Sequence, residues 1–184
     1  QAIDLASQRA TRRATLGKRV AEAVRIAEAT DGPVLIWCEF NREAEAVTEA
    51  IPGAVNVSGS DDPEAKADRL NGFSRGDFRV LVTKAKIAGF GMNWQHCNTM
   101  VFMGASHSYE QTYQAIRRCW RFGQKREVFA HIISAETERA VVANYRQKEA
   151  NAERMAVVMT ERAGEVLRAD IEAATGREWN PYLP

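Results

Sequence analysis

Apolar residues occur along the chain in two patterns, as short continuous runs and as longer stretches at helical spacing. The short runs are bounded by turn-forming residues, which is typical of strands buried on both faces of a parallel sheet. These runs predict strands at residues 34–37, 55–57, 79–83, 99–103 and 128–133.

Polar residues that can cap helices precede three of the stretches between these strands. Asn41, Asp62 and Ser108 each have a side-chain oxygen that can accept from the free N–H groups of a first helical turn. Pro63 suits the first helical position, and Gln111 completes a capping box with Ser108. The predicted helices cover about residues 41–50, 62–76 and 108–120.

Both ends of the chain are also predicted to be helical. Residues 1–29 carry apolar side chains at helical spacing and an outer face rich in Arg and Glu, and turn-forming residues at 30–33 end this helix. Ser134 can cap a long terminal helix that reaches about residue 170.

Strands that alternate with helices imply an α/β fold in which helices cover both faces of a parallel sheet. Ligands bind outside the carboxyl ends of such strands, so a site is expected in the loops after the third, fourth and fifth strands. We expect a helix or linker from an upstream domain at 1–32, the domain itself at 33–150, and a helical extension and tail at 151–184.

Composition narrows the class of protein only in part. The chain has 184 residues, of which 45% are apolar, enough for one core, and its net charge of +1 indicates no partner. The three cysteines are scattered without a Cys-x-x-Cys pair, so neither a metal site nor a disulfide framework is expected, and a reducing cytoplasm fits best. No segment is apolar for long enough to cross a membrane.

Gln114, Arg118 and Arg121 carry the most informative chemistry. Residues three and four apart share a helix face, so a helix that continues through Trp120 would bring these three side chains together. Two permanent cations with forked donors suit a polyphosphate. A solvated basic helix end is the alternative, and a lone pair of arginines would favour it.

The segment after the third strand combines glycines with positive charge. Gly89 and Gly91 permit tight turns and close approach of the backbone to a ligand, and Lys84 and Lys86 lie beside them. A dinucleotide-binding fingerprint is excluded because Trp94 stands where glycine or alanine is required.

Several motifs occur in an order that resembles superfamily 2 helicases, most closely the Swi/Snf-type branch. Residues 114–124 match the pattern Gln-Ala-x-x-Arg-x-x-Arg-Ile-Gly-Gln of motif VI, with Phe122 in place of Ile. Residues 89–93 match the Gly-x-Gly-x-Asn core of motif V, and residues 59–60 match a Gly-Ser pair that follows the second strand. The Trp-Asn-Pro that often precedes motif VI is replaced by residues 107–109, His-Ser-Tyr.

This resemblance covers residues 33–150 and implies the second RecA-like domain of a nucleic-acid-dependent ATPase. It implies that Arg121 is an arginine finger, that Arg118 contacts the terminal phosphates, and that Gln114 connects the site to the partner domain. Positions that match motif V are expected to help bind the nucleotide: Gly89, Gly91 and Asn93. Positions expected to contact the nucleic-acid backbone are Gly59, Ser60, Thr83, Lys84 and Lys86.

The sequence has neither a Gly-x-x-x-x-Gly-Lys-[Ser/Thr] phosphate loop nor an Asp-Glu pair on a strand. In this family those elements belong to the first RecA-like domain, so ATP and Mg²⁺ are expected to bind mainly there, on the same polypeptide, and the isolated chain is expected to be inactive. The resemblance favours duplex DNA as the substrate, and the short spacings suggest a compact bacterial or phage-type enzyme. The alternative is a non-enzymatic RecA-like scaffold that binds nucleic acid or protein, in which Arg118 and Arg121 form structural ion pairs.

Overall fold

A computed structural model describes residues 5–87, 92–104, 106, 108–135, 138, 142–143, 146–148, 150–151 and 154–155. The chain divides into two units, residues 1–142 and residues 143–184. In the second unit the described residues are helical, while most of the predicted terminal helix lies outside the described residues. The first unit holds the sheet and the candidate site.

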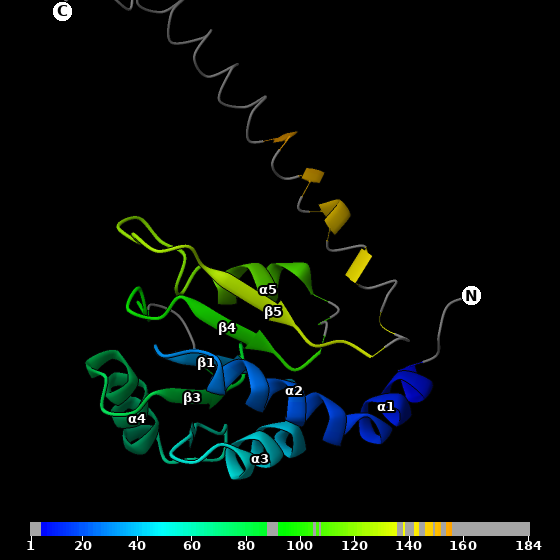
Figure 1. The fold of residues 1–184 in the computed structure, drawn as a ribbon, viewed down its shortest axis with the longest axis horizontal. Coiled ribbons are helices and arrows are strands. Elements are labelled where there is room, and N and C mark those ends of the chain that lie inside the picture. The colour runs from blue at the N-terminus through cyan, green and yellow to red at the C-terminus, as the bar shows by residue number, and fades with distance from the viewer. Residues whose placement is uncertain are drawn as a thin grey trace, which may run out of the picture. The chain divides into compact units, whose positions relative to one another are not determined.

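The first unit is built on one parallel sheet, as predicted (Figure 1). Its strand order is β2-β3-β1-β4-β5, and every adjacent pair is parallel. Each strand lies within a predicted run: β1 (Val34–Trp37), β2 (Val55–Asn56), β3 (Val80–Thr83), β4 (Thr99–Phe102) and β5 (Phe129–Ile132). Because all strands run the same way, the loops after them meet at one edge of the sheet.

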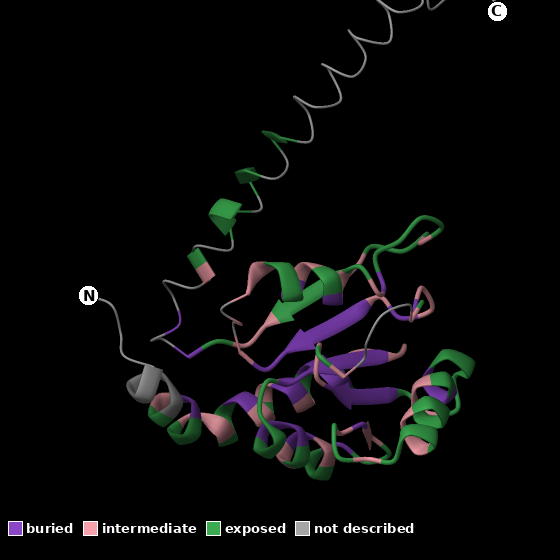
Figure 2. Ribbon diagram, turned by 180° about the vertical axis from the view of Figure 1, so that it is seen from behind, coloured by how far each residue is buried: buried purple, intermediate pink, exposed green. Residues whose placement is uncertain are grey.

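Helices cover both faces of this sheet, and side chains alternate between two cores. Val34 and Ile36 of β1 pack with α2 (Leu16–Glu28) and α3 (Asn41–Ala50), whereas Leu35 and Trp37 pack with α4 (Pro63–Arg75) and α5 (Tyr109–Ile116). The central strands are buried and the outer helical surfaces are exposed (Figure 2). The α/β class and the two-sided cover are therefore confirmed.

The N-terminal helix is broken where one continuous helix was predicted. α1 (Leu5–Ala14) ends before Thr15, and α2 starts at Leu16. The Thr15 hydroxyl donates to the Thr11 carbonyl at 2.8 Å, a bond that competes with regular helix geometry. Burial also differs from the expectation of a charged outer face, because Arg12 and Arg19 are buried at 7% and 3% exposure.

Capping at the internal helices agrees with the sequence in two cases of three. Asp62 caps α4 through the N–H of Glu64 at 2.9 Å, and Ser108 caps α5 through the N–H of Gln111 at 3.3 Å. The prediction for Asn41 was wrong, because Phe40 occupies the cap position of α3 and Asn41 is its first helical residue. The Glu43 carboxylate accepts from the Phe40 N–H instead.

Helix α5 is shorter than predicted, so Arg118 and Arg121 do not lie on a helix face. The regular helix ends at Ile116, and Arg118 donates its backbone N–H to Ala115, three residues back. The chain then turns, and Gly123 has a φ of +95°. The two arginines project from this turn rather than from a helix.

Candidate functional site

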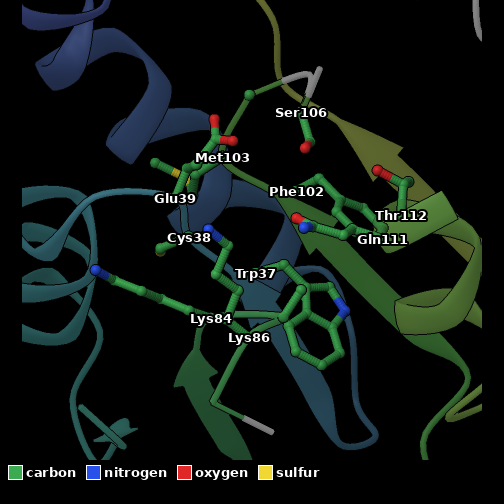
Figure 3. A pocket seen from close by; sticks show the side chains of 12 residues that line it. Trp37, Cys38, Glu39, Lys84, Lys86, Phe102, Met103, Ser106, Gln111 and Thr112 are labelled. Carbon is green, nitrogen blue, oxygen red and sulfur yellow. The ribbon is translucent and has the colours of Figure 1, made fainter. Parts of the chain in front are cut away.

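A cavity of about 280 Å³ lies at the carboxyl ends of β1, β3 and β4, where the sheet topology places ligand sites (Figure 3). Each of these strands contributes the residues that directly follow it, and the start of α5 closes one side. The lining residues are Trp37, Cys38, Glu39, Lys84, Ala85, Lys86, Phe102, Met103, Gly104, Ser106, Gln111 and Thr112. Lys84 and Lys86 bring positive charge to this edge, as the sequence predicted.

The loop after β2 lies beside the loop after β3. Val57 donates its N–H to the carbonyl of Val82 at 2.9 Å, and a Cβ on Gly59 would come within 3.8 Å of the Ile87 side chain. Ser60 is exposed in the loop after β2. The Nζ of Lys66 donates to the Gly59 carbonyl at 2.7 Å and so holds this loop. The two neighbouring loops carry four of the five residues expected to contact a nucleic-acid backbone, namely Gly59, Ser60, Lys84 and Lys86.

Thr83, the fifth, is fully buried inside the sheet. Its hydroxyl donates to the Val57 carbonyl at 3.0 Å and ties β3 to the end of β2. The side chain is thus committed to the fold and not presented to a ligand.

The turn after α5 presents two cations, Arg118 and Arg121. Arg121 is exposed and Arg118 is partly buried. Burial and the neighbouring charge of Arg121 lower the pKa of Arg118. Within the described part of the chain, neither guanidinium takes part in an ion pair. Two like charges on one turn favour an anionic ligand.

Backbone contacts join this turn to the end of the segment after β3. Trp94 donates its N–H to the Arg118 carbonyl at 2.9 Å, next to the exposed Asn93. The Gln124 amide donates to the carbonyls of Gln95 at 2.9 Å and Cys119 at 3.2 Å. The residues that directly follow motif V therefore contact the motif VI turn, while Gly89 and Gly91 lie outside the described residues.

Gln114 contacts Glu110 on α5, and its expected link to a partner domain stays a prediction. Its amide donates to the Glu110 carboxylate at 2.8 Å along the exposed side of α5. Gln114, Arg118 and Arg121 are also absent from the lining of the cavity. The structure thus shows two separate groups of candidate residues, the lysine-lined cavity and the arginine turn.

A buried ion-pair network at the same edge of the sheet was missed from the sequence. Arg12 contacts Glu39 and Glu138, each at 2.5 Å, and Arg19 contacts Glu43 at 2.8 Å. A sequence signal existed, because Arg19 precedes the buried Ala23 and Ile26 by four and seven residues and so shares their helix face.

The described residues contain no cluster of three or more His, Cys, Asp or Glu side chains that could hold a metal ion. Among the helices that they form, none is long and apolar enough to span a membrane.

Comparison with known proteins agrees with the fold and the motifs. The sequence profile of the helicase conserved C-terminal domain matches residues 17–123. No curated protein sequence matches the chain.

The solved structures that resemble the fold include two helicase domains. The C-terminal part of the Fun30 ATPase domain shares 20% identity with a TM-score of 0.55, and the match covers 68% of this chain and 42% of that one. The C-terminal domain of the DEAD-box protein Dbp5 shares 13% identity with a TM-score of 0.63, covering 73% of this chain and 80% of that one. The expected RecA-like fold of a superfamily 2 helicase domain is thereby confirmed, and the chain belongs to the helicase conserved C-terminal domain family.

Proposed function

We propose that this chain is the C-terminal half of an ATP-dependent helicase or translocase. ATP with Mg²⁺ would bind in a cleft between this domain and a first RecA-like domain of the same polypeptide. The observation that carries the proposal is that Arg118 and Arg121 lie on the same turn after α5 and form no ion pair with any described residue.

In this proposal Arg121 is the arginine finger, Arg118 contacts the terminal phosphates, and Gln114 connects the site to the partner domain. Charge that develops on the transferred phosphoryl group is stabilised by a positioned cation, and such a finger raises the rate by ~10³-fold or more. The exposed Arg121 can enter the cleft when it closes, while the Arg118 backbone is fixed by its bond to Trp94. Asn93, with Gly89 and Gly91, would link the nucleotide to the nucleic-acid grip.

The nucleic acid would be held through its phosphates along the loops after β2 and β3. Gly59 and Ser60 would supply a backbone amide and a hydroxyl from the loop after β2, and Lys84 and Lys86 would supply ammonium groups from the loop after β3. Contacts of this kind fix position without reading sequence. Thr83 would support the grip only by joining the two strands. We propose duplex DNA as the substrate, a Swi/Snf-type enzyme as the closest branch, and the cytoplasm as the location.

The test uses the full polypeptide, in which the first RecA-like domain precedes this one. Arg121→Ala is expected to lower DNA-stimulated ATP turnover by about 10³-fold, because it removes the cation without disturbing any described contact of the side chain. Arg117→Ala is the matched control, since Arg117 is a neighbouring exposed cation whose guanidinium stacks on Trp120. Turnover should stay near the wild-type value in the control.

Circular dichroism must show that Arg121→Ala retains the fold. Wild-type turnover in a folded Arg121→Ala protein would remove the finger role from the proposal. The non-enzymatic scaffold requires structural ion pairs at Arg118 and Arg121, and within the described residues these arginines form none.

A further inference from the structure

The cavity beside β3 is lined by side chains of opposite charge. Lys84 and Lys86 contribute two cations, and Glu39 is the one acidic side chain among the described residues that line it (Figure 3). A carboxylate in this position can pair with either lysine or repel an incoming phosphate. Whether the two lysines can bind a phosphate group therefore depends on which residue pairs with Glu39.

Arg12 of α1 holds that carboxylate. Its Nη1 donates to Oε2 of Glu39 at 2.5 Å, and its Nε donates to Oε1 of Glu138, also at 2.5 Å. Lys84 contacts a neutral acceptor instead, because its Nζ donates to Oδ1 of Asn41. No ion pair joins Glu39 to Lys84 or Lys86 among the described residues.

The surroundings of Arg12 leave its guanidinium little freedom. The side chain is 7% exposed, and its carbon Cζ lies 5.4 Å from the centre of the Phe40 ring. It lies against Gly104, where a Cβ would clash with Nη2 of Arg12. The carbonyl of Arg12 accepts from Nη2 of Arg19 at 2.8 Å, so its backbone is held as well.

We propose that Arg12 is a positioning residue that keeps Glu39 paired and so leaves Lys84 and Lys86 available to phosphate groups. Arg12 precedes the region that matches the helicase family, residues 17–123, so this function lies outside the shared domain. This inference rests on the proposed function in one respect, because it assumes that the phosphate groups belong to the bound nucleic acid.

Removing Arg12 would have two separable effects. Glu138, at 2% exposure, would lose its counter-ion, which destabilises the fold. Glu39, whose side chain is 41% exposed, would stay charged and become free to pair with a lysine. In a Glu138→Gln background the buried charge is absent, so removing Arg12 there tests only the release of Glu39.

The first measurement needs no nucleic acid. Lysines of the 184-residue chain are labelled by reductive ¹³C-methylation and their pKa values are measured by NMR. Adding Arg12→Met to Glu138→Gln is expected to raise the pKa of Lys84 or Lys86 by about half a pH unit, and adding Glu39→Gln as well should reverse it. Unchanged lysine pKa values in a folded Arg12→Met protein would overturn the proposal.

The second measurement follows the anisotropy of a fluorescein-labelled DNA duplex in low salt. Arg12→Met in the Glu138→Gln background should weaken binding roughly fivefold, and Glu39→Gln should restore it. Arg25→Met is the control for net charge, because Arg25 is an exposed cation on α2 that pairs with Glu22 at 2.6 Å. It should weaken binding by less than about twofold.

Glu39→Gln alone keeps the test sharp even if Arg12→Met does not fold. While Arg12 is present, this change should alter duplex affinity by less than about twofold, because the carboxylate is already neutralised. A fivefold gain would show that Arg12 does not mask Glu39 and would overturn the inference. If the wild-type chain does not bind the duplex, the proposed grip fails, and the lysine titration still decides the role of Arg12.

Discussion

Arg118 and Arg121 lie on the same turn but differ in solvent exposure. Arg118 is partly buried, its carbonyl is fixed by Trp94, and its pKa is lowered by burial and by the second cation. Arg121 is exposed on the turn. A bound polyphosphate would relieve the repulsion between the two, so each arginine gains from the ligand more than an isolated surface cation would.

His96 gives this domain a predictable dependence on pH. Burial of the ring lowers the pKa of His96, the charge of Arg126 lowers it further, and the backbone of Phe73 partly opposes both. The unfolded chain therefore binds this proton more readily than the folded one. We expect the free energy of unfolding to fall as pH drops below about 6.5, and to level off below the lowered pKa.

Urea unfolding of the wild type and of His96→Gln, measured between pH 5 and 8, checks this expectation. The difference between the two stability curves should change with pH in that window. A constant difference would mean that His96 titrates in the folded domain as it does in the unfolded chain.

At the scale of elements, α4 connects stability to the loop that would grip nucleic acid. Asp62 starts the helix, and Gly76 ends it in the left-handed conformation with a φ of +83°. From this helix Phe73 fills the core and Lys66 holds Gly59. Loss of the N-terminal cap of α4 would therefore affect both the packing of the core and the position of the loop after β2.

Asp62→Ala is expected to lower the free energy of unfolding by about 1 kcal/mol, because two N–H groups lose their acceptor. Asp62→Asn is the matched control, since asparagine caps as well as aspartate. Thermal unfolding should show a Tm about 2–4 °C lower for the alanine variant alone. Equal losses in both variants would point to the charge of Asp62 rather than its capping bond.

The sequence predicted those elements that are determined by residues close to them in the chain. Buried runs gave the strands to within a residue or two, and Asp62 and Ser108 cap their helices through groups two or three residues away. The early end of α5 could not be predicted, because the turn is fixed by contacts from Trp94 and Gln124. Burial of Arg12 depends on Glu138, which lies 126 positions later.

In the candidate site, too, the sequence predicted what the strand order determines and missed what a single side-chain orientation determines. The loops that hold Gly59 and the two lysines Lys84 and Lys86 lie at one edge of the sheet, because the order of parallel strands and the carboxyl-edge rule determine that edge. The motifs could not show that Thr83 points into the sheet, since one residue decides between the two faces of a strand. The roles of Gln114, Arg118 and Arg121 stay predictions.

At the scale of the whole molecule, the chain alone is expected to lack ATPase activity. It supplies a pair of arginines, but its sequence holds no phosphate loop and no Asp-Glu pair for a metal ion. Phosphate release by the purified 184-residue chain should stay at background with or without DNA. Turnover that scales with enzyme concentration and is abolished by Arg121→Ala would reveal a complete site within this chain.

The position of Arg12 also determines where this domain can be cut. A fragment that begins at Gly17 keeps every residue of the family match, yet it leaves the carboxylate of Glu138 in the interior with its Arg12 counter-ion gone. Protonation or local unfolding would have to relieve that charge. We therefore expect a fragment cut at the boundaries of the family match to be less stable and more sensitive to proteases than one that includes helix α1.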